Sequence, residues 1–227
     1  FIIVTEGRVL VNGQKSISPA QFVAPDDRVV VHGGDGYVGR GAVKLDAALE
    51  QFKIDVSGKV CADIGAATGG FTEVLLRRGA AKAYAIDTCH GKLAPKIRED
   101  NRVVVMERVD VRDLKSLPEA VDLVTIDVSL IPLENILPVV RRLMALSGSV
   151  VALLKPQYET RDQTVLRHGI IRDDTAREHI LGRFIVWAEE HGWRILDRME
   201  SPIRGGKGNV EYLLQLAIAQ RTAMAYT

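Results

Sequence analysis

The segment Val60–Phe71 constrains the fold of this chain more than any other stretch. It reads Val-Cys-Ala-Asp-Ile-Gly-Ala-Ala-Thr-Gly-Gly-Phe, an apolar run that contains an aspartate and leads into a glycine-rich turn. Phe71, Val74 and Leu75 then follow at helical spacing, and Gly79 stands where a helix would end. A strand, a glycine-rich turn and a helix N-terminus together favour a nucleotide-like ligand, because unpaired N–H groups and the helix dipole converge there.

Strands and helices alternate from Lys59 onward, which predicts a parallel α/β sheet with right-handed crossovers. A chain of 227 residues is long enough for one large domain, or for a domain of about 190 residues with a small appendage. The expected strands are 59–64, 82–87, 103–106, 121–127, 149–155, 194–199 and 210–218. The expected helices are 69–79, 91–99, 132–146 and 174–191.

Residues 1–34 differ from the rest and are expected to form a separate β segment, followed by a large domain over 35–227. The Asn12-Gly13 pair predicts a hairpin, residues 26–32 predict another short strand, and the glycines at 33, 34 and 36 mark the boundary. So short a segment cannot hold a core alone. It resembles the C-terminal half of the small RNA-binding domain of ribosomal protein S4, which implies a partial S4-like RNA-binding segment. A β-hairpin extension without an RNA role is the alternative.

Acidic residues stand at or just after the ends of four predicted strands, at Asp63, Asp87, Asp110 and Asp127. Ligands of open α/β sheets bind outside the carboxyl ends of the strands. We therefore expect all four carboxylates at one rim of the sheet, where they would surround a ligand. Each of them alone could instead cap a helix or lie in a loop.

The glycine-rich turn indicates which ligand to expect. Residues Gly65–Gly70 depart from the G-x-G-x-x-G pattern because position 67 is alanine, and Asp63 stands directly before the turn. A carboxylate there serves a pyrophosphate poorly but can pair with the ammonium group of S-adenosylmethionine, which is therefore favoured over a dinucleotide. A nucleotide-dependent oxidoreductase is accordingly disfavoured. The predicted cofactor-binding residues are Asp63, Gly65, Ala66, Thr68, Gly69, Gly70, Phe71, Asp87, Asp110 and Asp127.

Five motifs follow one another along the chain, at Tyr37–Lys44, Asp63–Phe71, Asp127–Ser129, Lys155–Glu159 and Gly208–Glu211. With these motifs the chain resembles the TlyA family of hemolysin-like rRNA 2′-O-methyltransferases, within the FtsJ-type class. The resemblance implies a Rossmann-like class I methyltransferase fold, with a seven-stranded, mostly parallel sheet and helices on both faces. It also implies a catalytic tetrad of Lys44, Asp127, Lys155 and Glu211.

Such a tetrad suits methylation of a ribose hydroxyl, which is a poor nucleophile until it loses its proton. A lysine can act as the general base when its surroundings favour its neutral form. We expect Lys155 to be the base and Lys44 to hold the substrate, with Asp127 and Glu211 orienting the two lysines. Asp127 and Lys155 close neighbouring predicted strands, and Glu211 opens the last strand.

The family resemblance implies ribosomal RNA or ribosomal subunits as the partner, with cytidine as the modified nucleotide. Basic side chains near the expected active rim are the candidates for phosphate contacts. The predicted RNA-binding residues are Arg40, Arg161, Arg172, Arg204 and Lys207.

Other classes of function find less support in the sequence. The two cysteines suggest reduced thiols in a cytoplasmic protein, and the five histidines are not paired with other ligands at metal spacing, so no metal is expected. No apolar run approaches the length of a membrane-spanning helix. A pore-forming hemolysin-like protein and a catalytically silent RNA-binding relative are kept as the alternatives to the methyltransferase.

Overall fold

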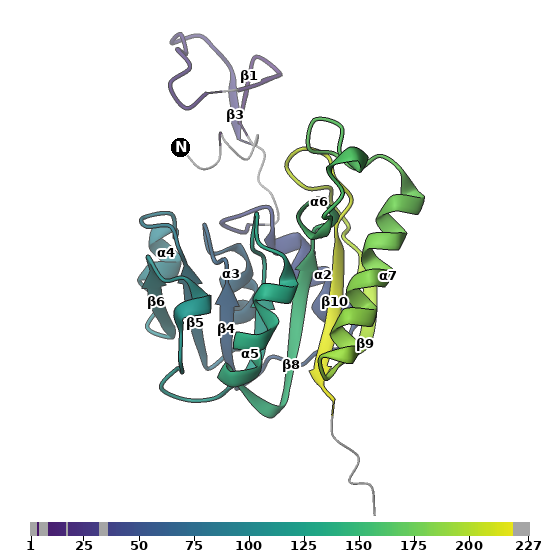
Figure 1. Cartoon of the computed structure of the whole chain (residues 1–227). Coiled ribbons are helices and arrows are strands. Elements are labelled where there is room, and N and C mark those ends of the chain that lie inside the picture. Colours follow the sequence, from purple (N-terminus) through teal and green to yellow (C-terminus); the bar gives the residue numbers. More distant parts are fainter. Residues whose placement is uncertain (1–3, 5–8, 17, 32–35, 220–227) are drawn as a thin grey trace, which may run out of the picture.

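A sheet of seven strands forms the centre of the protein (Figure 1), and the computed structural model describes residues 4, 9–16, 18–31 and 36–219. The strand order is β6-β5-β4-β7-β8-β10-β9. Neighbours from β6 to β8 run parallel, whereas β10 is antiparallel to both β8 and β9. The prediction of a seven-stranded, mostly parallel sheet is confirmed. The strands are β4 (Val60–Ile64), β5 (Lys82–Asp87), β6 (Val103–Glu107), β7 (Val121–Ile126), β8 (Met144–Leu154), β9 (Trp193–Glu200) and β10 (Tyr212–Ile218).

Helices cover both faces of this sheet, as predicted. Figure 1 shows α5 and α7 in front of the strands and α2 and α3 behind them. The helices are α2 (Ala42–Gln51), α3 (Gly70–Arg77), α4 (Pro95–Arg98), α5 (Leu137–Leu143), α6 (Pro156–Glu159) and α7 (Asp174–Glu190).

Two layers of core separate the sheet from these helices, because successive side chains of a strand point to opposite faces. In β4, Ala62 and Ile64 belong to the core layer beneath α5 and α7, where Phe184 is completely buried. Cys61, between them, belongs to the layer beneath α2 and α3. Strands that are apolar on both faces are typical of a parallel sheet sandwiched between helices. The burial of these strand side chains in both core layers holds the carboxyl ends of the strands in place.

Two predicted helices are much shorter in the structure, so their sequence-based boundaries are wrong. The helix expected over 91–99 consists only of Pro95–Arg98, because Gly91 has a φ of +70° and proline fits best in the first turn. The helix expected over 132–146 divides into a 3₁₀ turn and α5, and it ends where Met144 pairs with Val121. Strand β8 therefore begins five residues earlier than the expected residue 149.

A second, three-stranded sheet lies in the N-terminal segment, with β1 (Val9–Val11) between β2 (Gln14–Lys15) and β3 (Val29–Val31). The predicted hairpin is confirmed, since β1 and β2 are joined by Asn12 and Gly13 at φ values of 52° and 81°. The predicted boundary at residues 34 and 35 lies outside the described residues. The domain division and the S4-like role of this segment stay predictions.

Candidate active site

The glycine-rich turn follows β4 and has a backbone that requires glycine at its first position. Gly65 has a φ of +85°, and its N–H donates to the carbonyl of Ile86 at 2.8 Å. A Cβ atom at this position would lie 2.3 Å from the carbonyl oxygen of Asp127. Any side chain would therefore push the turn away from the residues that follow β7.

The rest of the turn is held by the neighbouring strand and by the segment around α4. Ala67 has a φ of +47°, unusual for a residue with a side chain, and its N–H donates to Asp87 Oδ2 at 2.8 Å. A Cβ on Gly69 would lie 2.9 Å from Leu93. The chain then enters α3 at Gly70, so the predicted strand, turn and helix are all present.

Asp63 is completely buried beneath this turn. Its Oδ2 accepts a hydrogen bond from the Thr72 hydroxyl at 2.6 Å, and its Oδ1 accepts one from Thr125 at 2.9 Å. Burial raises the pKa of the Asp63 carboxyl to about 6, although the two threonine hydrogen bonds act in the opposite direction. Asp63 therefore joins β4, α3 and β7, and its predicted contact with a cofactor ammonium group stays a prediction.

A cavity of about 390 Å³, here called the cofactor-side cavity, opens at the carboxyl ends of β4, β5, β6 and β7. Asp87, Asp110 and Asp127 border it together with apolar side chains such as Ile86 and Ile136. Arg112, hydrogen-bonded to Asp110, holds the pKa of that carboxyl below its usual range. Carboxylates for ribose hydroxyls and apolar walls for a flat base fit S-adenosylmethionine, and the volume lies in the range of small-molecule sites.

A smaller pocket of about 240 Å³ continues along the turn and shares Gly65 and Asp127 with the cofactor-side cavity. Most of the predicted cofactor residues are therefore brought to one rim. The members of this pocket among the predicted residues are Gly65, Ala66, Thr68, Gly70, Phe71 and Asp127.

A third cavity of about 530 Å³, here called the substrate-side cavity, brings Lys44, Asp127, Lys155 and Glu211 to one surface. The two lysines are 7% and 8% exposed, and each is paired with one carboxylate. Lys44 Nζ lies 2.5 Å from Glu211 Oε2, and Lys155 Nζ lies 2.6 Å from Asp127 Oδ1. Buried charges are tolerated when they are paired in this way.

Four different elements deliver these side chains. Lys44 lies in the first turn of α2, and Asp127 follows β7. Lys155 directly follows β8, and Pro156 begins the helix after it. Glu211 immediately precedes β10, the strand that pairs with β8. The predicted proximity of β7 and β8 is confirmed, and Asp127 borders both the cofactor-side and the substrate-side cavity.

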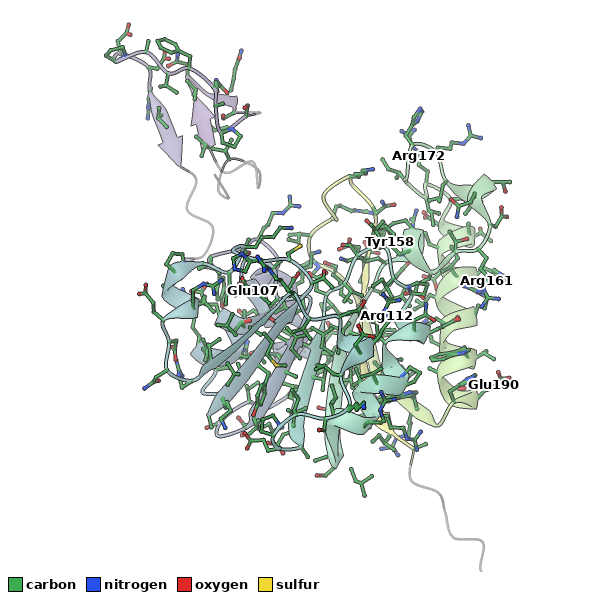
Figure 2. The ribbon with its side chains drawn as sticks, turned by 60° about the vertical axis from the view of Figure 1, so that its left-hand side comes forward. Glu107, Arg112, Tyr158, Arg161, Arg172 and Glu190 are labelled. Atoms are coloured by element: carbon green, nitrogen blue, oxygen red, sulfur yellow. The ribbon has the colours of Figure 1, made fainter. Side chains whose placement is uncertain are left out.

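The five predicted RNA-binding residues are all exposed, but they do not all border the same cavity. Lys207 borders the substrate-side cavity. Arg161, which is 82% exposed at its side chain, instead lies 3.4 Å from Glu134 in a groove along α7. Figure 2 shows Arg161 and Glu190 along α7 and Arg172 above them. An RNA role of these residues stays a prediction.

Three polar residues near the lysines were missed by the sequence analysis. The Ser129 hydroxyl accepts a hydrogen bond from Lys155 Nζ at 3.3 Å and borders both main cavities. Asn209 is buried between two loops. Glu159 is also buried, and burial raises its pKa to about 7. Ser129, Asn209 and Glu159 all fall inside motifs quoted above, so their positions were visible but their contacts were not.

Two other kinds of site were sought in the described part of the chain. No group of three or more histidine, cysteine, aspartate or glutamate side chains there could hold a metal ion. Among the same residues, no helix is long and apolar enough to cross a membrane.

Comparison with known proteins agrees with this geometry. Residues 37–217 match the family of FtsJ-like methyltransferases. The chain belongs to that family. The predictions of a methyltransferase and of S-adenosylmethionine as its cofactor are therefore confirmed.

Individual relatives carry two kinds of name. The 16S/23S rRNA (cytidine-2′-O)-methyltransferase TlyA of Mycobacterium tuberculosis (strain ATCC 25618 / H37Rv) is 41% identical over 220 residues, covering 94% of this chain and 81% of that protein. Hemolysin A of Brachyspira hyodysenteriae is 40% identical over 219 residues, covering 95% and 91%. A structure from Streptococcus thermophilus that carries the name hemolysin has a TM-score of 0.83 and 35% identity, covering 96% and 81%. The resemblance to the TlyA family is thereby confirmed.

Proposed function

We propose that this methyltransferase methylates the 2′-hydroxyl of a ribose in RNA, with cytidine in ribosomal RNA as the target. The observation that carries the proposal is the ion pair of Lys155 with Asp127, because Asp127 borders both the cofactor-side and the substrate-side cavity. The two cavities share Asp127, Ser129 and Leu130, so a group held in one cavity can meet a group held in the other beside this pair. The names of relatives such as the Mycobacterium tuberculosis protein supply the choice of cytidine and of ribosomal RNA.

The cofactor-side residues have a binding role in this proposal. Asp87 and Asp110 would accept hydrogen bonds from the ribose and adenine, and the glycine-rich turn from Gly65 to Gly70 would border the amino-acid portion. When it is bound, S-adenosylmethionine supplies a methyl group that is electrophilic because its sulfur is positively charged. The apolar walls of the cavity exclude water, which would otherwise compete with the ribose hydroxyl for this methyl group.

The four charged residues of the substrate-side cavity act on the hydroxyl as a tetrad. Lys155, once it has given up its own ammonium proton to solvent, accepts the proton of the 2′-hydroxyl and later passes that proton to solvent, while Asp127 fixes the direction of the Lys155 side chain. Lys44, fixed by Glu211, binds the neighbouring ribose or phosphate oxygen. Holding the hydroxyl in line with the methyl group is itself a large part of the acceleration expected for a two-substrate reaction.

The test replaces Lys155 by methionine, which keeps the length of the side chain and removes its amine. The assay follows transfer of a tritiated methyl group to ribosomal subunits and to naked ribosomal RNA, and nucleoside mass spectrometry identifies the product. We expect 2′-O-methylcytidine from the wild type and a loss of roughly 100-fold or more in Lys155→Met. Cofactor affinity, measured by calorimetry, should change by less than about threefold, because only transfer depends on the base.

Lys82→Met provides the control, since Lys82 is also a lysine paired with a carboxylate, that of Glu119 at 2.5 Å. It should transfer methyl groups like the wild type. Full activity of Lys155→Met would remove Lys155 from the mechanism, and a base-methylated product would contradict the ribose as the target.

A vesicle-leakage assay in parallel tests the alternative of a pore-forming protein. Absence of any methyl transfer would favour the alternative of a catalytically silent RNA-binding relative. A ribosomal RNA substrate also implies a cytoplasmic enzyme, which cell fractionation can check.

A further inference from the structure

Two loops flank the substrate-side cavity and lie side by side at the top of Figure 1. The first, here called the α6–α7 loop, comprises residues 160–173, and the second, the β9–β10 loop, comprises residues 201–211. Asn209 of the β9–β10 loop is only 4% exposed. Its Oδ1 accepts a hydrogen bond from the Ile171 N–H at 3.1 Å, and its Nδ2 donates to the Gly169 carbonyl at 2.9 Å. One side chain thus joins the two loops.

The hydrogen bonds within each loop show that Asn209 connects two preformed turns. In the α6–α7 loop, Arg167 and Ile170 exchange two backbone hydrogen bonds across His168 and Gly169, whose φ values are 55° and 78°. In the β9–β10 loop, the Gly205 N–H donates to the carbonyl of Asn209 at 2.9 Å. Each turn is closed by its own backbone hydrogen bonds, and the Asn209 carboxamide adds the two hydrogen bonds that join one turn to the other.

Both loops carry exposed, positively charged side chains that are not members of the proposed tetrad. Arg167 and Arg172 belong to the α6–α7 loop, and Arg204 and Lys207 belong to the β9–β10 loop. Lys207 lies directly across the other turn, since a Cβ on Gly169 would be 3.5 Å from Lys207 Nζ. The distance between the cations of one loop and those of the other is therefore governed by the hydrogen bonds of Asn209. Phosphate contacts of this kind fix the register of a nucleic acid without reading its sequence.

We propose that Asn209 is a positioning residue for the RNA strand: it locks the α6–α7 and β9–β10 loops into one cationic rim above the substrate-side cavity. The inference rests on the proposed RNA substrate and deepens it. Asn209 acts through the arginines and the lysine above it, so it governs affinity for RNA and not cofactor binding or methyl transfer. A carboxamide is suited to this role because it offers one acceptor and one donor to the two backbone groups of the opposite turn.

The test compares Asn209→Ala and Asn209→Asp with Asn135→Ala, an exposed asparagine outside the substrate-side cavity. Asn209→Ala leaves the Ile171 N–H and the Gly169 carbonyl without their partner, so we expect KM for RNA to rise roughly tenfold. We expect kcat at saturating RNA and cofactor affinity to stay within about twofold. The slope of log KM against log salt should fall by about one, because fewer phosphates are held at the same time. Asn209→Asp keeps the acceptor but places a carboxylate oxygen against the Gly169 carbonyl oxygen, so KM should rise at least as much as in Asn209→Ala.

Two further measurements separate this inference from the proposed function. In RNA-free protein, hydrogen exchange at the Ile171 amide should be at least tenfold faster in Asn209→Ala than in the wild type, whatever the substrate is. In a Lys207→Ala background, Asn209→Ala should raise KM by much less than tenfold, because the residue acts through that lysine. A fall in kcat with an unchanged KM, or unchanged exchange at Ile171, would overturn the inference. Failure of the wild type to methylate RNA, with exchange changed as expected, would overturn the proposed function alone.

Discussion

Replacing Asp63 by asparagine should make the protein more stable above neutral pH. The carboxyl is completely buried, and its pKa is raised from 3.8 to about 6 mainly by that burial. Between these pH values the folded state binds more protons than the unfolded chain. The stability that this group contributes is therefore fully present below about pH 3.8 and is lost as the pH rises through about 6.

The expected size follows from the difference between the two pKa values. A difference of about two pKa units corresponds to about 3 kcal/mol of unfolding free energy. No discount for solvent screening applies, because the side chain has no exposed surface. Asparagine has nearly the same shape and no charge, and it can accept a hydrogen bond from one of Thr72 and Thr125 and donate to the other.

Urea unfolding at several pH values between 5 and 8, followed by tryptophan fluorescence, measures the effect. The wild type should lose stability with rising pH more steeply than Asp63→Asn, and the variant should be more stable by up to about 3 kcal/mol at pH 8. Glu159, whose pKa is raised to about 7 by burial, contributes a fall of the same sign in both proteins and cancels in the comparison. Parallel pH curves, or a variant that is less stable at pH 8, would refute the argument.

Calorimetry on the same Asp63→Asn variant tests the predicted contact between Asp63 and the cofactor's ammonium group. If this contact forms, we expect cofactor affinity to fall by roughly tenfold.

Three further substitutions test the turn, the tetrad and the core. Gly65→Ala would place a Cβ 2.3 Å from the Asp127 carbonyl oxygen, so we expect a loss of more than about 2 kcal/mol in urea unfolding and of detectable cofactor binding in calorimetry. Glu211→Gln leaves buried Lys44 without its carboxylate, so methyl transfer should fall by roughly 100-fold while cofactor affinity stays within about threefold. An equal loss of methyl transfer and of cofactor affinity would mean that Glu211 acts in cofactor binding and not on the substrate. Phe184→Ala should cost about 3–5 kcal/mol of unfolding free energy in urea, and a loss below about 1 kcal/mol would mean that the site collapses without leaving a cavity.

The fold was predictable because strand periodicity and the glycine-rich turn are local signals. The seven-stranded, mostly parallel sheet followed from the family resemblance, whereas element boundaries depended on contacts that local patterns do not contain. Met144 illustrates this point, since its neighbours continue a helical pattern but its pairing with Val121 draws it into β8. The shortening at Gly91 is the opposite case, because its glycine was a visible stop signal.

The site was predictable in its residue types and less so in its contacts. Asp63 illustrates the difference: its place at the end of β4 was foreseen, but its burial depends on Thr72 and Thr125, which lie 9 and 62 residues away along the chain. Arg161 belongs to a loop near the rim, yet its side chain turns toward Glu134 and the groove along α7. Loop side chains take directions that depend on distant partners, which sequence spacing does not record.

The place of β10 has a consequence for the order in which the active protein is assembled. Lys44 and Glu211 are separated by 167 positions, and β10 is the last strand among the described residues although it lies between β8 and β9 in the sheet. Every residue that borders the cofactor-side cavity has been synthesised by residue 136. A chain that stops before residue 211 therefore holds the complete cofactor-side lining while its Lys44 lacks a partner. Under the proposed mechanism, methyl transfer would therefore require β10 to be synthesised and paired in the sheet, whereas the cofactor-side lining is complete before β10 is made.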